Sequence, residues 1–330
     1  MEFNFFADLS TKYERGVPMV KVIGVDEFGG PEMLKAFDIP ERPVGAGQVR
    51  VNVGAAAVSP TDTIHRSGGR AELLQKDPPP YVPGMDIAGT VSEVGEGVDH
   101  LKLGDAVMGI VAPTASHGGY SSSIVLPARS VAHSPHGASV AEASTLPMNG
   151  LTAQYALDLL NLPKGAVLAV TGAAGAFGGY MVQLGVHRGL HVIADSSEAD
   201  EALVRSLGAH EIVRRGVDVA ERIRALVPDG VDGLADGSIQ NEQVLGAVRD
   251  NGGFATVRGW QGPSERGITL HQVWVREYAT ELEKLDELRA LVEAGEVTLR
   301  VAATFPADQA SEAHRVLEAG GTRGRCVITF

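Results

Sequence analysis

Three glycines near the middle of the chain have the spacing of a phosphate-binding loop. Gly172, Gly175 and Gly178 lie between the apolar run VLAVT and a second apolar run with helical spacing. In such a strand–turn–helix unit the glycines permit the tight turn, the approach of backbone to a pyrophosphate, and close helix–strand packing. The start of the helix adds free N–H groups. The pattern predicts a dinucleotide site made of Gly172, Ala173, Ala174, Gly175, Ala176, Phe177 and Gly178.

The end of the following strand bears on which dinucleotide binds. Asp195, Ser196 and Ser197 occupy that position. An acidic residue there accepts hydrogen bonds from the free 2′-hydroxyl of NAD and repels the 2′-phosphate of NADP. Arg214 and Arg215 end the next expected strand, and with the serines they offer groups that hold a 2′-phosphate. A solvated strand end explains the arginines equally well, so the residues alone leave NAD and NADP open.

The charge and composition of the chain limit its partners and its compartment. Its 330 residues carry a formal net charge of −13, whereas nucleic-acid binding needs a basic surface, so we expect no nucleic-acid partner. No run approaches the roughly 20 apolar residues of a membrane helix, so we expect no membrane partner. Cys326 is the only cysteine, and the first residues lack the pattern of a signal peptide. These features predict a cytoplasmic protein.

Hydrophobic patterning divides the chain into two kinds of structure. From Val20 to about Ala132, short valine- and glycine-rich segments separated by turn residues predict an all-β region. From about Ser139, strand and helix alternate, which predicts a parallel sheet with helices on both faces. Strands are expected near 167–171, 191–195, 211–213, 231–235 and 253–257, with a sixth in 268–275. Helices are expected near 178–188, 199–206, 217–226 and 240–249.

Sequence blocks along nearly the whole chain carry a family resemblance. They include AAAVSPTDTIHRSG, YVPGMDIAGTVSEVGEGV, LPMNGLTAQYAL and TGAAGAFGGYMVQLGV, in the family's order and spacing. The chain resembles the zinc-free quinone oxidoreductase (zeta-crystallin-like) branch of the medium-chain dehydrogenase/reductase superfamily. The resemblance implies an α/β fold, with a Rossmann doubly wound parallel sheet plus a GroES-like β-barrel catalytic domain formed by both chain ends.

The same resemblance implies domain limits, cofactor and partners. The catalytic domain is expected in 19–142 and 281–330 and the Rossmann domain in 143–280, while residues 1–18 form an N-terminal extension of unknown role. NADPH is expected to meet a small-molecule carbonyl or quinone substrate in a cleft between the domains. NADH is the alternative cofactor because of Asp195. A homodimer is also implied, with the apolar strand at 268–275 pairing across the subunit edge.

Comparison with the family's zinc-dependent branch predicts that no metal is bound. Zinc-dependent relatives have Cys-x-x-Asp where this chain has SPTD at 59–62, and Gly-His-Glu where it has GMD at 84–86. The remaining carboxylates, Asp62 and Asp86, make a poor zinc site without nitrogen or sulfur ligands. Without this Lewis acid simple ketones become difficult substrates. Quinones and α,β-unsaturated carbonyls are easier, because conjugation spreads the negative charge that arrives with a hydride.

Candidate catalytic residues follow from the resemblance. Ser59 and Asp62 are expected to line the nicotinamide end of the cleft, and Thr63 and His65 are the candidates for orienting or protonating the substrate. His65 also fits an exposed position on a loop or at the barrel rim. Ile64 stands where quinone reductases often carry a tyrosine, which leaves the proton donor open.

The resemblance also assigns four more residues to the cofactor. Thr152 matches a family threonine near the nicotinamide and phosphates. Gly259 and Trp260 follow the fifth expected strand, where the family chain passes the nicotinamide carboxamide. Trp260 fits a pocket wall and domain packing equally well. Arg325 matches a basic family residue near the cofactor cleft, although a cation on a surface strand explains it better.

The expected activity is zinc-independent, NADPH-dependent transfer of a hydride to a quinone or an α,β-unsaturated carbonyl in the interdomain cleft. One alternative is an enoyl or ketone reductase of secondary metabolism with the same fold. Another is an NADPH-binding sensor with little turnover. The sequence does not specify the substrate, because the pocket shape depends on the loops 67–82 and 258–268.

Overall fold

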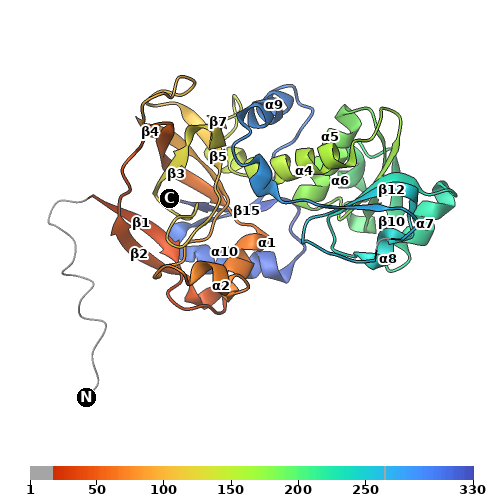
Figure 1. The fold of residues 1–330 in the computed structure, drawn as a ribbon, viewed down its shortest axis with the longest axis horizontal. Helices are drawn as coiled ribbons and strands as arrows, with labels where there is room; N and C mark the ends of the chain where they lie inside the picture. The colour runs from red at the N-terminus through yellow and green to blue at the C-terminus, as the bar shows by residue number, and fades with distance from the viewer. Residues whose placement is uncertain (1–17, 264) are drawn as a thin grey trace, which may run out of the picture.

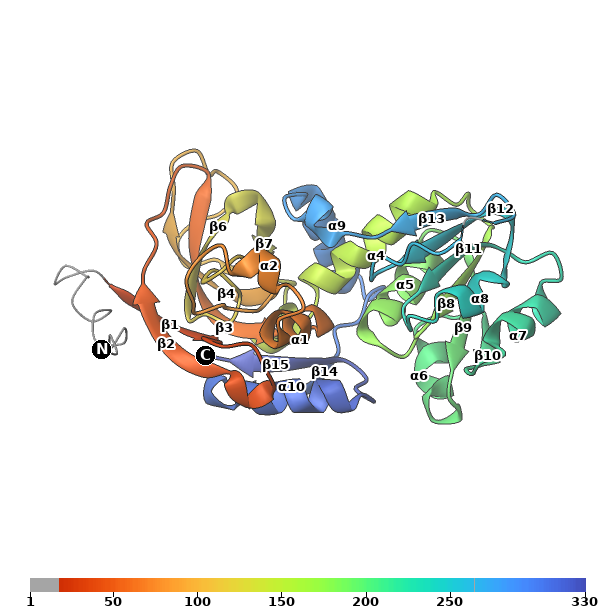
Figure 2. The same cartoon turned by 60° about the horizontal axis from the view of Figure 1, so that its bottom comes forward.

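Two lobes, each containing a large β-sheet, make up the molecule (Figures 1 and 2). The structure is a computed structural model that describes residues 18–263 and 265–330. Residues 1–17 of the expected N-terminal extension lie outside the described residues. Helices α4 (Pro147–Leu160) and α9 (Leu282–Glu293) lie between the lobes. Within the described ranges, no helix has the length and apolar character needed to cross a membrane.

The second lobe, which contains strands β8 to β13, is built around a six-stranded sheet in which all neighbouring strands run parallel. The order is β10-β9-β8-β11-β12-β13. The strands are β8 (Val167–Thr171), β9 (His191–Ser196), β10 (Glu211–Arg214), β11 (Val231–Asp236), β12 (Val248–Thr256) and β13 (Thr269–Gln272). This is the doubly wound order, which reverses between β8 and β11. Ligands of such sheets bind beyond the carboxyl ends of the strands at that reversal.

Helices cover both faces of this sheet, as the alternating pattern predicts. Besides α4 they are α5 (Ala176–His187), α6 (Glu201–Ser206), α7 (Val219–Leu226) and α8 (Glu242–Leu245). The helix expected over 240–249 is wrong in extent, because Ile239 and Asn241 have positive φ angles before it and β12 already begins at Val248. Val248 pairs there with Val231 of β11. The sixth strand is confirmed, but it covers only Thr269–Gln272.

The first lobe contains a seven-stranded sheet formed by both ends of the chain. Its order is β14-β15-β3-β4-β5-β7, with β6 paired to β3. The strands are β3 (Gln48–Ala57), β4 (Asp86–Val94), β5 (Ala106–Ile110), β6 (Ser123–Pro127), β7 (Val131–His133), β14 (Val301–Pro306) and β15 (Arg325–Thr329). The C-terminal β15 pairs antiparallel with β3. This β lobe and the parallel sheet confirm the predicted fold class, while the numerical domain limits stay a prediction.

Shorter elements complete the first lobe. β1 (Met19–Gly24) and β2 (Lys35–Pro40) form a separate antiparallel pair. The helices are α1 (Pro60–Ser67), α2 (Ala71–Leu74), α3 (Val140–Ala143) and α10 (Ala310–Ala319). Single 3-10 turns cover Pro31–Met33, Ala128–Ser130, Glu198–Asp200, Val275–Tyr278 and Ala307–Gln309. Pro60 suits the first turn of α1, where a missing N–H costs nothing, and Gly68 ends the helix with a φ of 90°.

The hydrophobic core explains how the lobes are held together. Leu285 and Leu288 of α9 pack in the same buried cluster as Leu151 and Leu157 of α4 and Leu168 of β8. A second cluster fills the interior of the β lobe, and a third lies on the opposite face of the parallel sheet. Because α4 and α9 share one core with the parallel sheet, they fix the position of the cleft between the lobes.

Candidate functional site

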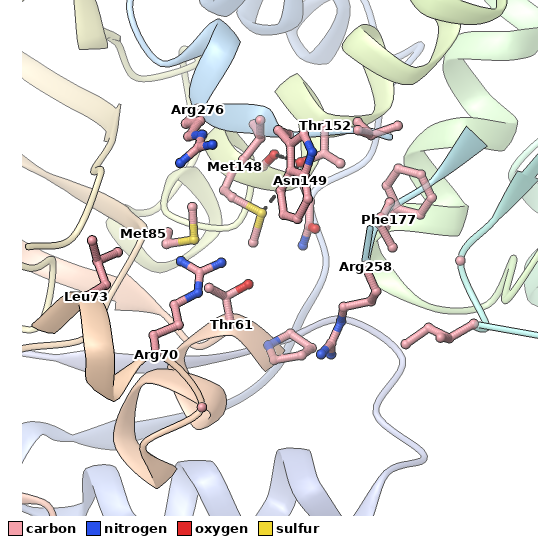
Figure 3. A pocket seen from close by; sticks show the side chains of 18 of the residues that line it. Thr61, Arg70, Leu73, Met85, Met148, Asn149, Thr152, Phe177, Arg258 and Arg276 are labelled. Atoms are coloured by element: carbon pink, nitrogen blue, oxygen red, sulfur yellow. Dashed lines mark hydrogen bonds between the residues drawn. The ribbon is translucent and has the colours of Figure 1, made fainter. Parts of the chain in front are cut away.

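A cleft of about 810 Å³ lies between the lobes, where the order of the parallel sheet reverses (Figure 3). The β lobe contributes the start of α1, the loop that leads into α2, α2 itself, and the residue before β4. The other lobe contributes α4, the start of α5 and the segments after β11, β12 and β13. Lining side chains include Thr61, Arg70, Leu73, Met85, Met148, Asn149, Thr152, Phe177, Arg258, Trp274 and Arg276. The arrangement agrees with the expected interdomain location of the site.

The glycine loop has the geometry that its spacing predicts. Gly172 has a φ of 67°, a left-handed conformation that favours glycine. A Cβ atom on Gly178 would lie 2.3 Å from the carbonyl oxygen of Gly172, so only glycine permits this approach of helix to turn. Gly175 is the N-cap of α5, and no side chain caps it. The first N–H groups of a twelve-residue helix are therefore available to an anion.

Arg300, from the segment before β14, holds this loop in place. Its Nη1 donates to the carbonyl of Ala174 at 3.0 Å, and its Nη2 donates to the carbonyl of Gly175 at 2.6 Å. Gly179 has no side chain to obstruct this contact, since a Cβ there would lie 2.2 Å from the guanidinium. Ala173 is fully buried and Phe177 lines the cleft, while Ala176 is partly exposed on the first turn of α5. Sequence reasoning missed Arg300, which lies far from the loop in the chain.

Asp195 lies at the end of β9, directly against the glycine loop. Its Oδ1 accepts a hydrogen bond from the N–H of Ala173 at 3.2 Å. Its buried Oδ2 has no hydrogen-bond partner among the described residues. Burial raises the pKa of this carboxyl, partly offset by the hydrogen bond from Ala173. A buried acceptor without a donor suits the hydroxyl of a ribose, so the position fits a dinucleotide.

The groups around Asp195 include both the expected serines and the expected arginines. Ser196 donates to the carbonyl of Ser197 at 2.8 Å, and Ser197 donates to Asp200 at 2.5 Å. Arg214 pairs in register with Ser196 on β10. Arg214 and Arg215 are exposed, and neither guanidinium has a hydrogen bond or ion pair within the described residues. Both serine hydroxyls donate within the protein, whereas the two guanidinium groups have no partner within the described residues.

Ser59 and Asp62 differ from the expectation that they line the cleft. Both are buried and neither belongs to its lining. The Asp62 carboxylate accepts hydrogen bonds from the N–H of Ser59 at 2.8 Å, the N–H of Gly84 at 3.0 Å and the hydroxyl of Tyr120 at 3.2 Å. Burial raises its pKa to about 6 against the lowering effect of these backbone donors. Asp62 thus fastens the start of α1 to the segment before β4.

Thr63 and His65 also lie away from the cleft. Thr63 donates to the carbonyl of Pro60 at 2.9 Å, a bond within its own helix. His65 is buried rather than exposed, which corrects the expected loop or rim position. Asp62, His65 and Arg66 share one face of α1, three and four residues apart, and this face turns into the β lobe. Of α1, only its first residues, Pro60 and Thr61, line the cleft.

Thr152, Gly259 and Trp260 have different surroundings. Thr152 lines the cleft, and its hydroxyl donates to the carbonyl of Met148 one turn earlier, at 2.6 Å. Trp260 packs against Phe254 with ring centroids 5.5 Å apart, in the core on the outer side of the sheet, so it acts in domain packing. Trp274 lines the cleft instead. Gly259 has a φ of 68°, and a Cβ there would lie 2.8 Å from the Trp274 ring.

Arg325 is a buried residue, which corrects the expectation of a surface cation. Its Nη2 lies 2.7 Å from Oδ2 of Asp86, and its guanidinium also donates to the carbonyls of Ala57 and Val58. Burial lowers the pKa of Arg325, but the Asp86 carboxylate outweighs that effect and raises it above the ordinary value. Arg325 does not line the cleft, and its contacts tie β15 to the end of β3 and to β4.

The two carboxylates that remain in the family's zinc-binding motifs, Asp62 and Asp86, do not fit a metal. Asp62 accepts three hydrogen bonds, and Asp86 is paired with Arg325 and accepts the N–H of Met148 at 2.6 Å. No group of three or more histidine, cysteine, aspartate or glutamate residues within 18–263 and 265–330 is placed to hold a metal ion. Bound zinc would have to displace several buried hydrogen bonds while gaining no nitrogen or sulfur ligand.

Several lining residues were not among the sequence candidates. Arg70 and Arg258 lie in the two loops expected to shape the pocket. The sequence therefore predicted the loops, but it did not single out these two residues within them. Thr61 lies in the first turn of α1, next to the candidate Asp62. Asn149 and Met148 precede Thr152 on α4 and share its cleft-facing side. No sequence pattern around Trp274 predicts that it lines the cleft, because the position of its ring depends on the left-handed turn at Gly259.

Comparisons with known proteins agree with this architecture. Residues 45–151 match the model of the alcohol dehydrogenase GroES-like domain, and residues 207–328 match that of a zinc-binding dehydrogenase. A 2-haloacrylate reductase of a Burkholderia species is 30% identical over 94% of this chain and 99% of its own. The pig quinone oxidoreductase is 29% identical over 95% of this chain and 98% of its own.

A solved structure shows the same similarity. The crystal structure of the CurK enoyl reductase has a TM-score of 0.83 and 25% sequence identity, over 94% of this chain and 99% of that one. The likeness extends over both lobes and across the cleft, and the chain spans nearly the full length of each of these three proteins.

Proposed function

The chain belongs to the medium-chain dehydrogenase/reductase superfamily, as a quinone oxidoreductase-like protein, and from this premise we propose that it is a zinc-independent, NADPH-dependent reductase of quinones or α,β-unsaturated carbonyls. One observation carries the proposal. The glycine loop and a cleft of about 810 Å³ meet at the reversal of the parallel sheet. Zinc independence has its own support, because Asp62 and Asp86, the carboxylates that remain in the zinc-binding motifs, are engaged in internal hydrogen bonds and an ion pair.

The residues of this chain act by binding and orientation. The N–H groups at the start of α5 hold the pyrophosphate, and Thr152, Phe177 and Thr61 border the space for the nicotinamide and the acceptor. When bound, the dinucleotide supplies a hydride, and the acceptor gains this hydride and one proton. Among the described lining residues there is no histidine, tyrosine or cysteine, and Glu72 is the only acid. We therefore assign the proton to solvent that enters the cleft.

The proposed preference for NADPH rests on the groups around Asp195. Arg214 and Arg215 offer two free guanidinium groups beside the end of β9. Asp195 directs one oxygen to the N–H of Ala173 in the glycine loop. The free Oδ2 of Asp195 is the feature that favours NADH instead. The experiment below therefore compares both cofactors.

The names of the relatives support a conjugated acceptor. A haloacrylate, a quinone and an enoyl compound each contain an electron-poor C=C bond in conjugation with a carbonyl or carboxyl group. Such acceptors spread the incoming negative charge without a Lewis acid. An enoyl reductase of secondary metabolism is the second candidate, favoured by the full-length similarity to the CurK enoyl reductase.

Steady-state oxidation of NADPH and NADH tests the proposal. Each cofactor is combined with ortho-quinones, para-quinones, enones and enoyl thioesters, with and without a chelator, and the zinc content of the protein is measured. We expect chelator-insensitive turnover that favours NADPH, with far less than one zinc per chain. A preference for NADH contradicts the cofactor proposal, and loss of activity with chelator contradicts zinc independence. Tight NADPH binding with no turnover points to the sensor alternative.

A homodimer remains part of the proposal. β13 lies at the edge of the parallel sheet, so its outer backbone groups are free to pair with the same strand of a second copy. Light scattering after size exclusion gives the molar mass directly. We expect twice the chain mass, and a proline in place of Leu270 should shift the protein toward monomer; a monomeric wild type contradicts the dimer.

A further inference from the structure

Three arginines line the cleft, although the chain as a whole carries a formal net charge of −13. Arg70 follows α1, Arg258 follows β12, and Arg276 lies in the 3-10 turn Val275–Tyr278. Figure 3 shows their side chains around one space, with Thr61 between Arg70 and Arg258 in this view. The cleft is thus a local concentration of positive charge in an acidic protein.

Two of these arginines have no partner within the protein. The guanidinium groups of Arg70 and Arg258 form no hydrogen bond or ion pair within the described residues. Glu72 also lines the cleft but pairs with neither of them. Arg276 differs, because its guanidinium lies 5.9 Å from the centroid of the Trp274 ring and 3.8 Å from a carboxylate oxygen of Glu277. Arg70 and Arg258 are therefore the free cations of the cleft.

The two free cations act on each other. Burial in the cleft lowers the pKa of Arg258, and the charge of Arg70 lowers it further. Both side chains are exposed to the cleft, and their like charges repel each other, so an anion between them offsets this repulsion. Their arrangement is typical of a site that is completed by a negatively charged ligand.

The sheet order indicates which ligand carries that charge. Arg258 follows β12, whereas Asp195 and Arg214 follow β9 and β10 on the other side of β8. A dinucleotide with its pyrophosphate on the loop after β8 directs its adenosine toward β9 and β10, and its nicotinamide toward β11 and β12. The phosphates of the cofactor thus lie away from Arg70 and Arg258. An anion that binds beside these arginines would therefore belong to the acceptor.

We propose that Arg70 and Arg258 bind a carboxylate of the acceptor, so that the preferred substrates are α,β-unsaturated carbonyl compounds that carry a carboxylate. This inference rests on the proposed reductase function. A planar guanidinium matches a carboxylate with two parallel hydrogen bonds, and two arginines fix both its place and its plane. Met85, Met148 and Leu73 give the rest of the acceptor an apolar surface.

Matched substrates test the assignment. 3-Benzoylacrylate and its methyl ester contain the same enone, and both are reduced at the C=C bond by one hydride and one proton. We expect the wild type to reduce the acid with a kcat/KM about 10- to 100-fold above that of the ester. Arg70→Gln and Arg258→Gln should remove most of this preference, because each should raise the KM for the acid more than the KM for the ester. Arg315→Gln, at an exposed position on α10, is the control.

Binding of the saturated acid 3-benzoylpropionate gives a readout without turnover. Quenching of tryptophan fluorescence reports it, because Trp274 lines the same cleft. A Kd that rises about tenfold or more in both variants, but not in Arg315→Gln, supports the anion site even if no substrate is reduced; in that case the reductase function alone fails. If acid and ester are reduced equally, or if the variants bind the acid as the wild type does, the inference is overturned.

Discussion

The guanidinium of Arg325 lies 2.7 Å from the carboxylate of Asp86, and both side chains are buried. Arg325 begins the last strand of the chain and Asp86 begins β4, so this pair joins the C-terminus to the strands contributed by the N-terminal half. It lies beside α4, whose Met148 N–H donates to the same Asp86 carboxylate. The pair therefore positions the helix that carries Thr152 to the cleft.

Loss of one member of this pair should destabilise the protein strongly. Arg325→Met leaves the Asp86 charge buried without its partner, and we expect the free energy of unfolding to fall by about 3–5 kcal/mol. Asp86→Asn added to Arg325→Met should restore part of the loss, because it removes that charge. Urea unfolding measures both. Arg315→Met, which breaks only exposed contacts with Glu312 and Ser311, should change stability by less than about 1 kcal/mol. A similarly small effect of Arg325→Met contradicts this prediction.

The glycine loop should not tolerate a methyl group at its third glycine. A Cβ at position 178 would lie 2.3 Å from the carbonyl oxygen of Gly172, so Gly178→Ala must push α5 away from the turn. We expect a loss of about 1–3 kcal/mol in stability and a clear loss of dinucleotide affinity, measured by fluorescence titration. Gly246→Ala is the control, since its Cβ would lie 3.9 Å from the nearest side chain. Equal affinities of wild type and Gly178→Ala would falsify the role of this contact.

Arg215, one of the two free arginines near Asp195, should contribute to the cofactor preference. Arg215→Gln removes one cation from the proposed 2′-phosphate position, so the Kd for NADPH should rise about tenfold while that for NADH stays nearly constant. Fluorescence of the bound reduced nicotinamide measures both without turnover. Arg222→Gln tests specificity, because Arg222 lies nearby on α7 but pairs with Asp218 at 2.7 Å. Parallel changes for NADPH and NADH in Arg215→Gln would show that it does not contact the 2′-phosphate.

His65 should make the protein less stable in mild acid. Burial, with the charge of Arg70 as a smaller cause, lowers its pKa in the folded state from 6.5 to about 4. Below pH 6.5 the unfolded chain binds a proton that folded His65 does not, so stability falls as the pH drops toward 4. This effect amounts to about 3 kcal/mol at full extent.

His65→Phe tests the assignment, because it removes the titrating group and keeps an apolar ring in a site where His65 makes no side-chain hydrogen bond. The slope of unfolding free energy against pH should become flatter between pH 6.5 and 4, whatever the variant's stability at pH 7. His314, which has its pKa lowered by burial to about 3, retains its own contribution of the same sign. An unchanged slope in His65→Phe contradicts the prediction.

The sequence by itself determined the features that depend on neighbouring residues. The strand, the turn at Gly172 and the start of α5 follow one another in the chain, so their spacing predicts the phosphate-binding geometry directly. The position of Asp195 at the end of the next strand follows in the same way. The alternation of strands and helices specifies a doubly wound sheet, because parallel strands need a crossover between them.

Only the tertiary structure decided which side chains reach the cleft. Asp62 and His65 turn into the β lobe because their face of α1 packs there, and Trp260 lies on the outer face of the sheet. Arg325 is buried because β15 closes against β3. Arg70 and Arg258 come together from opposite lobes. Which side chains meet in the cleft depends on how segments far apart in the chain pack together, and a local sequence pattern cannot predict this.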